Sequence, residues 1–89
     1  MSARRAERTL DAPATVLYFA ALRDAAGAAS EPVEARGTLG ALYDRLGERH
    51  GFRWPRTQVR VAVDGRFAAW DDAVRAASEI AFIPPVSGG

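Results

Sequence analysis

The sequence predicts an α+β roll, in which one main helix packs on a mixed sheet of four to five strands. Three observations predict it: short β-branched and aromatic segments toward both ends of the chain, one amphipathic helical segment between them, and a two-residue turn signal in the second half. The 89 residues suffice for one domain, and no internal repeat or low-complexity linker divides them.

The first expected element is a strand over residues 15–22, which are β-branched, aromatic and of strand length. Apolar residues occupy both faces, with Tyr18 on one and Phe19 on the other. An antiparallel strand with one wet face would alternate apolar with polar residues. We therefore expect the second face of this strand to be covered by other parts of the chain or by a partner.

A short turn or helical turn is expected next, over residues 23–27, ending at Gly27. Residues 31–36 form a weaker predicted strand. Pro32 lies within it, and because proline donates no backbone hydrogen bond, this strand is expected at an edge of the sheet.

The clearest helix follows Thr38, whose hydroxyl can cap the first turn, and Gly51 stands at the natural C-terminal cap. Gly40 and Gly47 weaken the helix by up to about 1 kcal/mol each relative to alanine, so tertiary packing must hold it. The residues at helical spacing that would face the sheet are Leu39, Leu42, Tyr43, Leu46 and His50.

The second half of the chain predicts a hairpin and a final strand. Residues 59–63 alternate as a half-buried strand, Asp64-Gly65 is a strong two-residue hairpin signal, and residues 66–69 return as a short strand. Residues 70–74 indicate a turn into a brief helical segment capped by an aspartate. Residues 79–83 form the last predicted strand.

Composition excludes several classes of function. The net charge of +1 gives no strong field for nucleic acid or for an anionic membrane, and no apolar run is long enough to span a bilayer. Without cysteine there is no disulfide, thiolate metal site or cysteine nucleophile. Residues 1–14 contain three arginines but no apolar h-region, so we expect a flexible leader rather than a signal peptide, and a cytoplasmic protein.

The polar residues offer no catalytic set. His50 is the single histidine and is expected to interact with the helix dipole or to cover the core edge. Asp71 and Asp72 point to different sides of any regular element, so capping is the better interpretation. Ser87 has no base beside it, and no phosphate-binding glycine loop is present.

The C-terminal segment is the most informative feature of the chain. After an apolar strand, Pro84-Pro85 favours an extended spacer, and Gly88 and Gly89 have no side chains. Such a tip could enter a channel too narrow for other residues. We expect the chain to end at Gly89, whose carboxylate would be the working group.

Two segments resemble a known family. Residues 16–23 are similar to its first strand and the arginine that follows, and residues 79–89 resemble its C-terminal signature almost residue for residue. The family is the MoaD-type small, sulfur-carrier subunit of molybdopterin synthase, a ubiquitin-like β-grasp protein. The resemblance extends over residues 15–89. It implies a β-grasp domain over residues 15–83 and an extended C-terminal tail over residues 84–89.

The resemblance implies that the chain is no enzyme on its own, but the small subunit of the molybdopterin synthase sulfurtransferase complex. A ubiquitin-activating-like adenylyltransferase would use ATP to adenylate Gly89, and a sulfur donor enzyme would supply the sulfur of a C-terminal thiocarboxylate. The chain itself would bind no cofactor and no metal. The tail would thread into the large synthase subunit, where sulfur passes to a pyranopterin precursor, through Pro84, Pro85, Val86, Ser87 and Gly88.

The family also binds its partners through an apolar outer face of the sheet. Carried over by position, that face would include Phe19, Phe67 and Ile83. Arg23 and Phe82, from the two segments that carry the resemblance, are assigned to partner binding as well. For Phe19 the alternative is an ordinary core role.

Three alternatives remain open: a sulfur carrier for thiazole or cysteine synthesis, a ubiquitin-like modifier joined to lysines of target proteins, and an interaction module with an inert tail. The Pro-Pro-Val-Ser spacer favours the molybdopterin branch. All 12 basic residues are arginines, so the N-terminal amine is the one isopeptide acceptor that this sequence offers.

Overall fold

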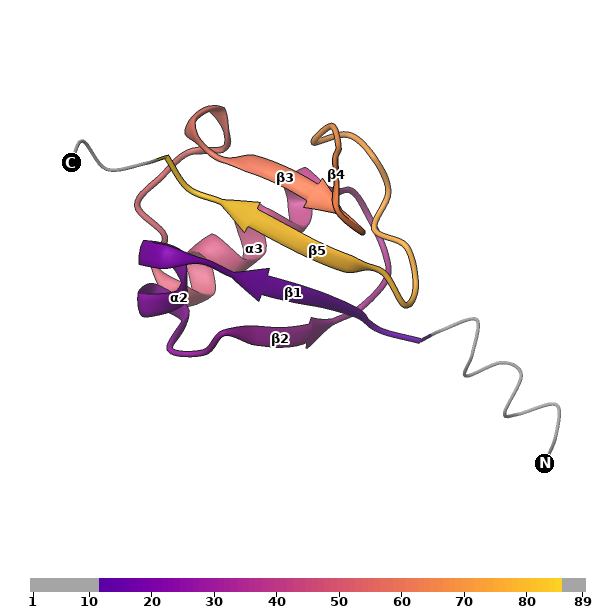
Figure 1. The fold of residues 1–89 in the computed structure, drawn as a ribbon, viewed down its shortest axis with the longest axis horizontal. Coiled ribbons are helices and arrows are strands. Elements are labelled where there is room, and N and C mark those ends of the chain that lie inside the picture. The colour runs from indigo at the N-terminus through magenta and orange to yellow at the C-terminus, as the bar shows by residue number, and fades with distance from the viewer. Residues whose placement is uncertain (1–11, 86–89) are drawn as a thin grey trace, which may run out of the picture.

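The computed structural model describes residues 12–85, which form a five-stranded mixed sheet in the order β2-β1-β5-β3-β4. Helix α3 packs on one face of this sheet, behind the strands in Figure 1. The predicted α+β roll with one main helix is thereby confirmed. The elements are β1 (Ala14–Tyr18), α2 (Ala20–Ala26), β2 (Ser30–Val33), α3 (Leu39–His50), the 3-10 turn η1 (Arg56–Gln58), β3 (Arg60–Val63), β4 (Arg66–Phe67) and β5 (Glu79–Ile83).

The first strand is shorter than predicted, because residues 20–26 form helix α2 instead of continuing it. Strand β1 starts at Ala14, one residue before the expected start of the domain. The segment after Phe19 contains four alanines, the strongest helix formers, and it buries Leu22 against the core. The predicted end at Gly27 is confirmed, since Gly27 adopts a left-handed conformation and its N–H donates a hydrogen bond to the carbonyl of Arg23.

Strand β2 forms one edge of the sheet, as Pro32 predicted, but it spans Ser30–Val33 rather than residues 31–36. The N–H of Tyr18 donates to the carbonyl of Ala29 at 2.8 Å, so alternate residues of this segment face β1. Pro32 falls in the other set. Its missing N–H therefore lies on the open edge, which leaves that edge poorly suited to pairing with another strand.

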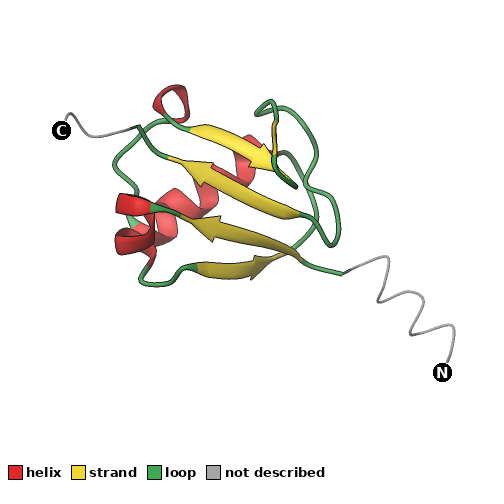
Figure 2. Ribbon diagram, in the orientation of Figure 1, coloured by secondary structure: helices red, strands yellow, loops and turns green. Residues whose placement is uncertain are grey.

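Helix α3 has both predicted caps. The hydroxyl of Thr38 accepts the N–H of Ala41 at 3.1 Å, and Gly51 is left-handed with a φ of 73°. The helix buries its predicted apolar face against the sheet, and the core consists mainly of Val16, Tyr18, Leu22, Leu39, Leu42, Tyr43, Leu46, Val61, Ile80 and Phe82. Figure 2 shows this arrangement, with α3 along the far side of the strands.

The hairpin between β3 and β4 forms at Asp64-Gly65, where both residues have positive φ, as the sequence predicted. The helical segment expected over residues 70–74 is absent and that expectation was wrong; a turn takes its place. The reason is that two backbone carbonyls of this segment accept hydrogen bonds from the start of α3. Leu39 N–H donates to Asp72 O at 2.9 Å, and Gly40 N–H donates to Trp70 O at 2.8 Å.

Strand β5 has its predicted bounds, Glu79–Ile83, and lies at the centre of the sheet. It runs parallel to β1 and antiparallel to β3. Because β1 and β5 run in the same direction, the chain enters β1 at one end of the sheet and leaves β5 at the other (Figure 1). The C-terminal tail therefore follows the central strand of the sheet, which has a neighbouring strand on both sides.

Candidate functional site

The base of the C-terminal tail is fixed to the domain through its first proline. Ile83 pairs with Arg60 of β3, and Pro84 after it is buried, whereas Pro85 is exposed. Pro84, which we expected to belong to the free spacer, is thus part of the packed domain. Gly89 and the tail residues Val86, Ser87 and Gly88 lie outside the described residues, so their roles stay predictions.

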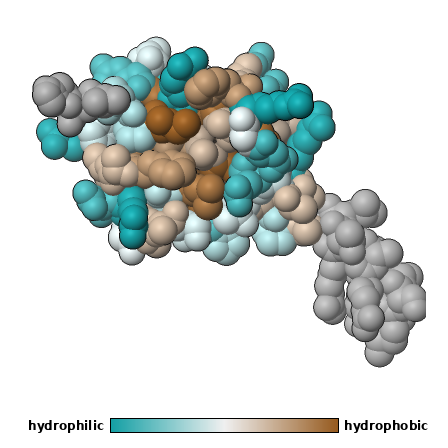
Figure 3. Space-filling model, in the orientation of Figure 1, coloured by the Kyte–Doolittle hydropathy of each residue, from teal (hydrophilic) through white to brown (hydrophobic). Residues whose placement is uncertain are grey.

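The sheet face opposite α3, here called the outer face, carries a row of apolar side chains. The pairing places Leu17 beside Ala81, Ala81 beside Ala62, and Ala62 beside Phe67 across four strands. In Figure 3, which looks onto this face, brown apolar atoms gather over its centre with teal residues around them. Among the described residues no helix covers it. The second face of β1, which the sequence predicted to need a cover, is therefore open within the described part of the chain.

The predicted partner-binding residues divide into two groups. Phe19 and Phe67 are 46% and 63% exposed, and Ile83 is half-buried beside Arg60 on the outer face. Phe19 keeps an extended backbone after β1, and so it continues the alternation that turns Leu17 outward. Their exposure excludes the core role considered for Phe19.

Phe82 does not belong to this surface, and its assignment to partner binding has to be corrected. It is fully buried, facing α3, because it alternates along β5 with the outward residues Ala81 and Ile83. Its ring packs on Tyr43 and Trp70, with centroids 5.1 and 5.9 Å apart. Phe82 thus holds the strand that leads into the tail.

Two arginines border this surface in different ways. The guanidinium of Arg60 lies 4.0 Å from the centroid of the Phe67 ring, on the outer face. This cation–π contact orients an otherwise exposed ring. Arg23 is exposed on α2, next to the strand end that carries Phe19. Whether Arg23 contacts a partner stays a prediction.

A carboxylate cluster that sequence reasoning missed ties β2 to the end of α3. Glu31 accepts a hydrogen bond from the hydroxyl of Tyr18, contacts His50 Nε2 at 2.8 Å and pairs with Arg49 at 3.1 Å. Burial acts to raise the pKa of Glu31, but the hydrogen bonds from Tyr18 and His50 and the charge of Arg49 outweigh it and lower that pKa. The pKa of Tyr18 is raised, mainly by burial and to a smaller extent by its hydrogen bond to Glu31.

This cluster fastens the edge strand β2 to β1 and to the end of α3. His50 is half-buried against the rings of Tyr18 and Phe52, so the expected position at the core edge is confirmed. Its partner Glu31 is remote in sequence, and no local pattern could have identified it. Within residues 12–85, no group of three potential ligand side chains could hold a metal ion.

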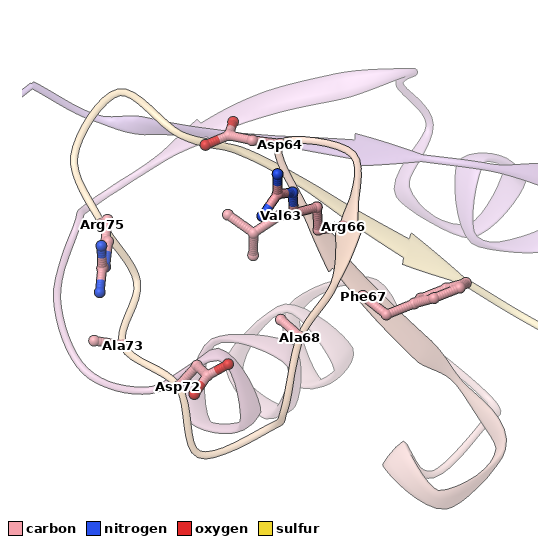
Figure 4. Close-up of a pocket in the computed structure, with 8 residues that line it drawn as sticks. All are labelled: Val63, Asp64, Arg66, Phe67, Ala68, Asp72, Ala73 and Arg75. Carbon is pink, nitrogen blue, oxygen red and sulfur yellow. The ribbon is translucent and has the colours of Figure 1, made fainter.

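A hollow of about 510 Å³ lies at the end of the sheet opposite the tail, between the β3–β4 hairpin and residues 72–75. Figure 4 shows that the ring of Phe67 points away from it. The carboxylates that line it serve turns: Asp64 accepts the N–H of Glu79 at 2.9 Å, and Asp72 accepts that of Ala69 at 3.0 Å. The prediction that an aspartate here caps a helical segment was wrong, because no helix begins there and the Asp72 carboxylate closes a turn instead. The hollow brings none of the predicted tail residues together.

Neither helix of the described chain is long and apolar enough to cross a membrane. This finding agrees with the absence of a long apolar run from the sequence.

Comparison with known proteins places these features in a family. Residues 16–89 match the model of the ThiS family. A search of curated proteins found no match.

Solved structures share the fold over most of the chain. Small archaeal modifier protein 1 (SAMP1) from Haloferax volcanii is 28% identical, with a TM-score of 0.69 over 86% of this chain and 99% of its own. A putative molybdopterin converting factor, subunit 1, from Pyrococcus furiosus is 27% identical, with a TM-score of 0.70 over 84% and 99%. SAMP1 from Methanosarcina acetivorans, 21% identical with a TM-score of 0.67 over 89% and 98%, shows the fold alone.

Proposed function

The chain belongs to the ThiS family of ubiquitin-like sulfur carriers with a β-grasp fold, and from this premise we propose that it carries sulfur on the carboxylate of Gly89 for molybdopterin synthesis. The observation that supports the proposal most is the exposed apolar outer face beside the strand that leads into the tail. A partner seated on this face would have the tail within reach.

The proposed reaction takes place on partner enzymes. The Gly89 carboxylate attacks the α-phosphate of ATP, which releases pyrophosphate and leaves an acyl adenylate. Hydrosulfide supplied by a donor enzyme then attacks the carbonyl carbon and displaces AMP, and the product is a thiocarboxylate. The chain supplies the carboxylate and the handle that holds it, and the adenylating partner supplies the catalytic groups. This division fits a chain without cysteine.

The loaded tail then enters the larger subunit of the synthase, where the thiocarboxylate sulfur displaces an oxygen substituent of the pyranopterin precursor. Water then cleaves the resulting thioester, which returns the Gly89 carboxylate and leaves the sulfur on the precursor. Pro84 is buried and Pro85 is exposed, so the tail leaves the surface of the domain at Pro85. The likeness to the Pyrococcus furiosus molybdopterin converting factor supports this acceptor. We propose a cytoplasmic site for the pathway, where ATP is available.

One mass measurement tests the proposal. The protein is incubated with the ThiS-family activating enzyme, ATP and a sulfur donor, and its intact mass is compared before and after. We expect a gain equal to the exchange of one oxygen for one sulfur, located at Gly89 by fragmentation. Absence of the sulfur-for-oxygen gain, together with adducts in which the Gly89 carboxylate is joined to amines of other proteins, would exclude the carrier role.

The second candidate is a protein modifier, which the likeness to Haloferax volcanii SAMP1 favours. An isopeptide bond needs the same activated Gly89, so adenylation alone does not separate the two functions. Transfer to a lysine-containing target in the absence of any sulfur donor would favour the modifier. Because this sequence has no lysine, such a modifier would be extended into chains only through its N-terminal amine.

A further inference from the structure

A second hollow, of about 450 Å³, lies between α3 and the loop that follows it. It belongs to the helix layer and is therefore separated from the outer face by the sheet. We call it the helix-side groove, and it is lined by Tyr43, Asp44, Gly47, Glu48, Phe52, Trp54, Pro55 and Arg56. Three aromatic side chains, two carboxylates and one guanidinium thus meet at one surface depression.

The absence of a side chain at Gly47 keeps the groove open. A Cβ built there would lie 3.7 Å from the ring of Phe52, which is ordinary contact distance. Any residue larger than alanine would therefore extend into the space beside the ring. The helix accepts a glycine here although alanine favours the helical state by about 1 kcal/mol.

Trp54 is half-buried: part of its side chain packs against the core, and the rest is open to the groove. The hydroxyl of Tyr43 donates to the Trp54 carbonyl at 2.6 Å, which fixes the backbone of the loop. Within residues 12–85, the half-buried indole stacks on no other ring and no guanidinium lies over it. Tryptophan is enriched among the residues that dominate binding energy at interfaces.

Arg56, the one arginine that lines the groove, is engaged by Asp44. Its Nε atom lies 3.4 Å from Asp44 Oδ1, and its guanidinium extends over Gly40. Asp44 is thereby neutralised. Glu48, by contrast, forms no ion pair in the described part of the chain, so the groove retains one uncompensated negative charge beside its rings.

We propose that the helix-side groove is a docking site for an arginine side chain of a partner protein. A carboxylate next to aromatic rings attracts a cation, and the planar, weakly hydrated guanidinium stacks on rings better than an ammonium does. The chain itself uses this contact on the other face of the sheet, where Arg60 covers Phe67 at 4.0 Å.

The position of the groove adds a functional consequence. Pro55 precedes η1, and η1 leads into β3 at Arg60, the residue that pairs with Ile83 at the base of the tail. The groove therefore lies at the tail end of the molecule, but on the layer opposite the outer face. A protein that inserts an arginine there can hold the carrier while another partner occupies the outer face. This inference does not depend on sulfur transfer.

Nuclear magnetic resonance tests the groove with defined probes. The ¹⁵N-labelled full chain is titrated with N-acetyl-arginine amide, and with the isosteric, uncharged N-acetyl-citrulline amide, at low ionic strength. The two indole N–H signals, assigned with Trp54→Phe, report separately on the groove and on Trp70, which is stacked on Phe82 in the core. We expect a saturable shift of Trp54 with the arginine probe, no shift of Trp70, and little response to the citrulline probe.

Charge variants complete the test. Glu48→Gln should weaken the arginine probe by roughly two- to fivefold, the range expected for one exposed ion pair. Glu34→Gln, which removes the same charge from an exposed residue paired with Arg36, should leave the affinity unchanged. Absence of a Trp54 shift, an equal shift with citrulline, or equal affinity in Glu48→Gln would overturn the proposal. Removal of Gly89 should not alter probe binding, so failure here is distinct from failure of sulfur loading.

Discussion

The guanidinium of Arg56 lies where a side chain on Gly40 would stand. The N–H of Gly40 also donates to Trp70 O at 2.8 Å, and a Cβ on Gly40 would come within 3.2 Å of that oxygen. Gly47, two turns further along α3, has no such neighbour, because a Cβ there would make only ordinary contact with Phe52. The two glycines of one helix therefore have different structural roles.

Substitution by alanine should affect the free energy of unfolding differently at these two positions. Gly47→Ala should raise the free energy of unfolding by up to about 1 kcal/mol, through helix propensity. Gly40→Ala should be less stable than Gly47→Ala by about 1–3 kcal/mol, because Arg56 and the Trp70 carbonyl must shift. Urea unfolding followed by circular dichroism measures both. Equal gains for the two variants would show that Arg56 moves without cost.

This pair also shows where sequence-based prediction ends. From the sequence, Gly40 and Gly47 are both expected only to weaken the helix. What makes them different is contact with Arg56 and Trp70, which lie further along the chain and reach Gly40 only in the folded protein. Local signals performed well: Thr38 and Gly51 bound the helix, and Asp64-Gly65 forms the hairpin. Such signals depend on neighbours within a few residues and need no knowledge of the tertiary fold.

The predictions that were wrong depended on contacts between residues that are distant in the sequence. Residues 70–74 carry a capping pattern, but their carbonyls are taken by the N–H groups of Leu39 and Gly40, so no helix forms. Phe67 and Phe82 are the same residue type in adjacent parts of the fold, yet one is 63% exposed and the other is fully buried. Consecutive residues of a strand face opposite sides, so Phe82 and Ile83 could not both lie on the outer face; which of the two is buried depends on how the strand packs in the sheet.

Phe67 and Phe82 should therefore respond differently to mutation. Phe67→Asp should change the free energy of unfolding by about 1 kcal/mol or less, because the ring is on the surface. It should weaken binding to the activating enzyme by at least about tenfold, as expected for an aromatic interface residue. Phe82→Ala should cost about 3–5 kcal/mol of stability through the cavity it leaves. Calorimetry with the partner and urea unfolding separate the two effects.

Phe19→Asp provides a second position on the outer face, at the other side of the apolar row from Phe67. The two variants should lower partner affinity in the same direction while leaving the circular dichroism spectrum intact. Global unfolding of Phe19→Asp would instead assign that residue to the core, against its 46% exposure.

The Glu31 cluster predicts a pH-dependent contribution to stability. The pKa of Glu31 is lowered in the folded state from a reference value of 4.5, so its contribution is complete above that value and is lost as the pH falls through the folded pKa. Glu31→Gln should cost about 1–2 kcal/mol near neutral pH, because Tyr18, His50 and Arg49 lose a charged acceptor. The deficit relative to the wild type should shrink in acid.

Glu34→Gln is the matched control for this prediction, since it removes the same charge from the exposed residue that directly follows β2. Its pair with Arg36 spans 3.5 Å between side chains that are largely exposed, so the loss should stay within about 0.5 kcal/mol at every pH. Thermal unfolding scans between acid and neutral pH compare the three proteins. A constant deficit for Glu31→Gln across the range would contradict the proposed role of its charge.

Deleting Gly89 should abolish sulfur loading without affecting the fold. The buried core ends at Pro84, and the hydrogen-bonded sheet ends one residue earlier, at Ile83, so no described packing involves the last residue. The truncated chain should unfold at the wild-type urea midpoint, yet its mass should stay unchanged with the activating enzyme, ATP and a sulfur donor. Deletion of residues 1–11 is the control and should load normally, because the described chain enters β1 at the opposite end of the sheet. Sulfur loading by the Gly89 deletion would refute the assignment of the carrier group, since the new terminal carboxylate would then serve equally well.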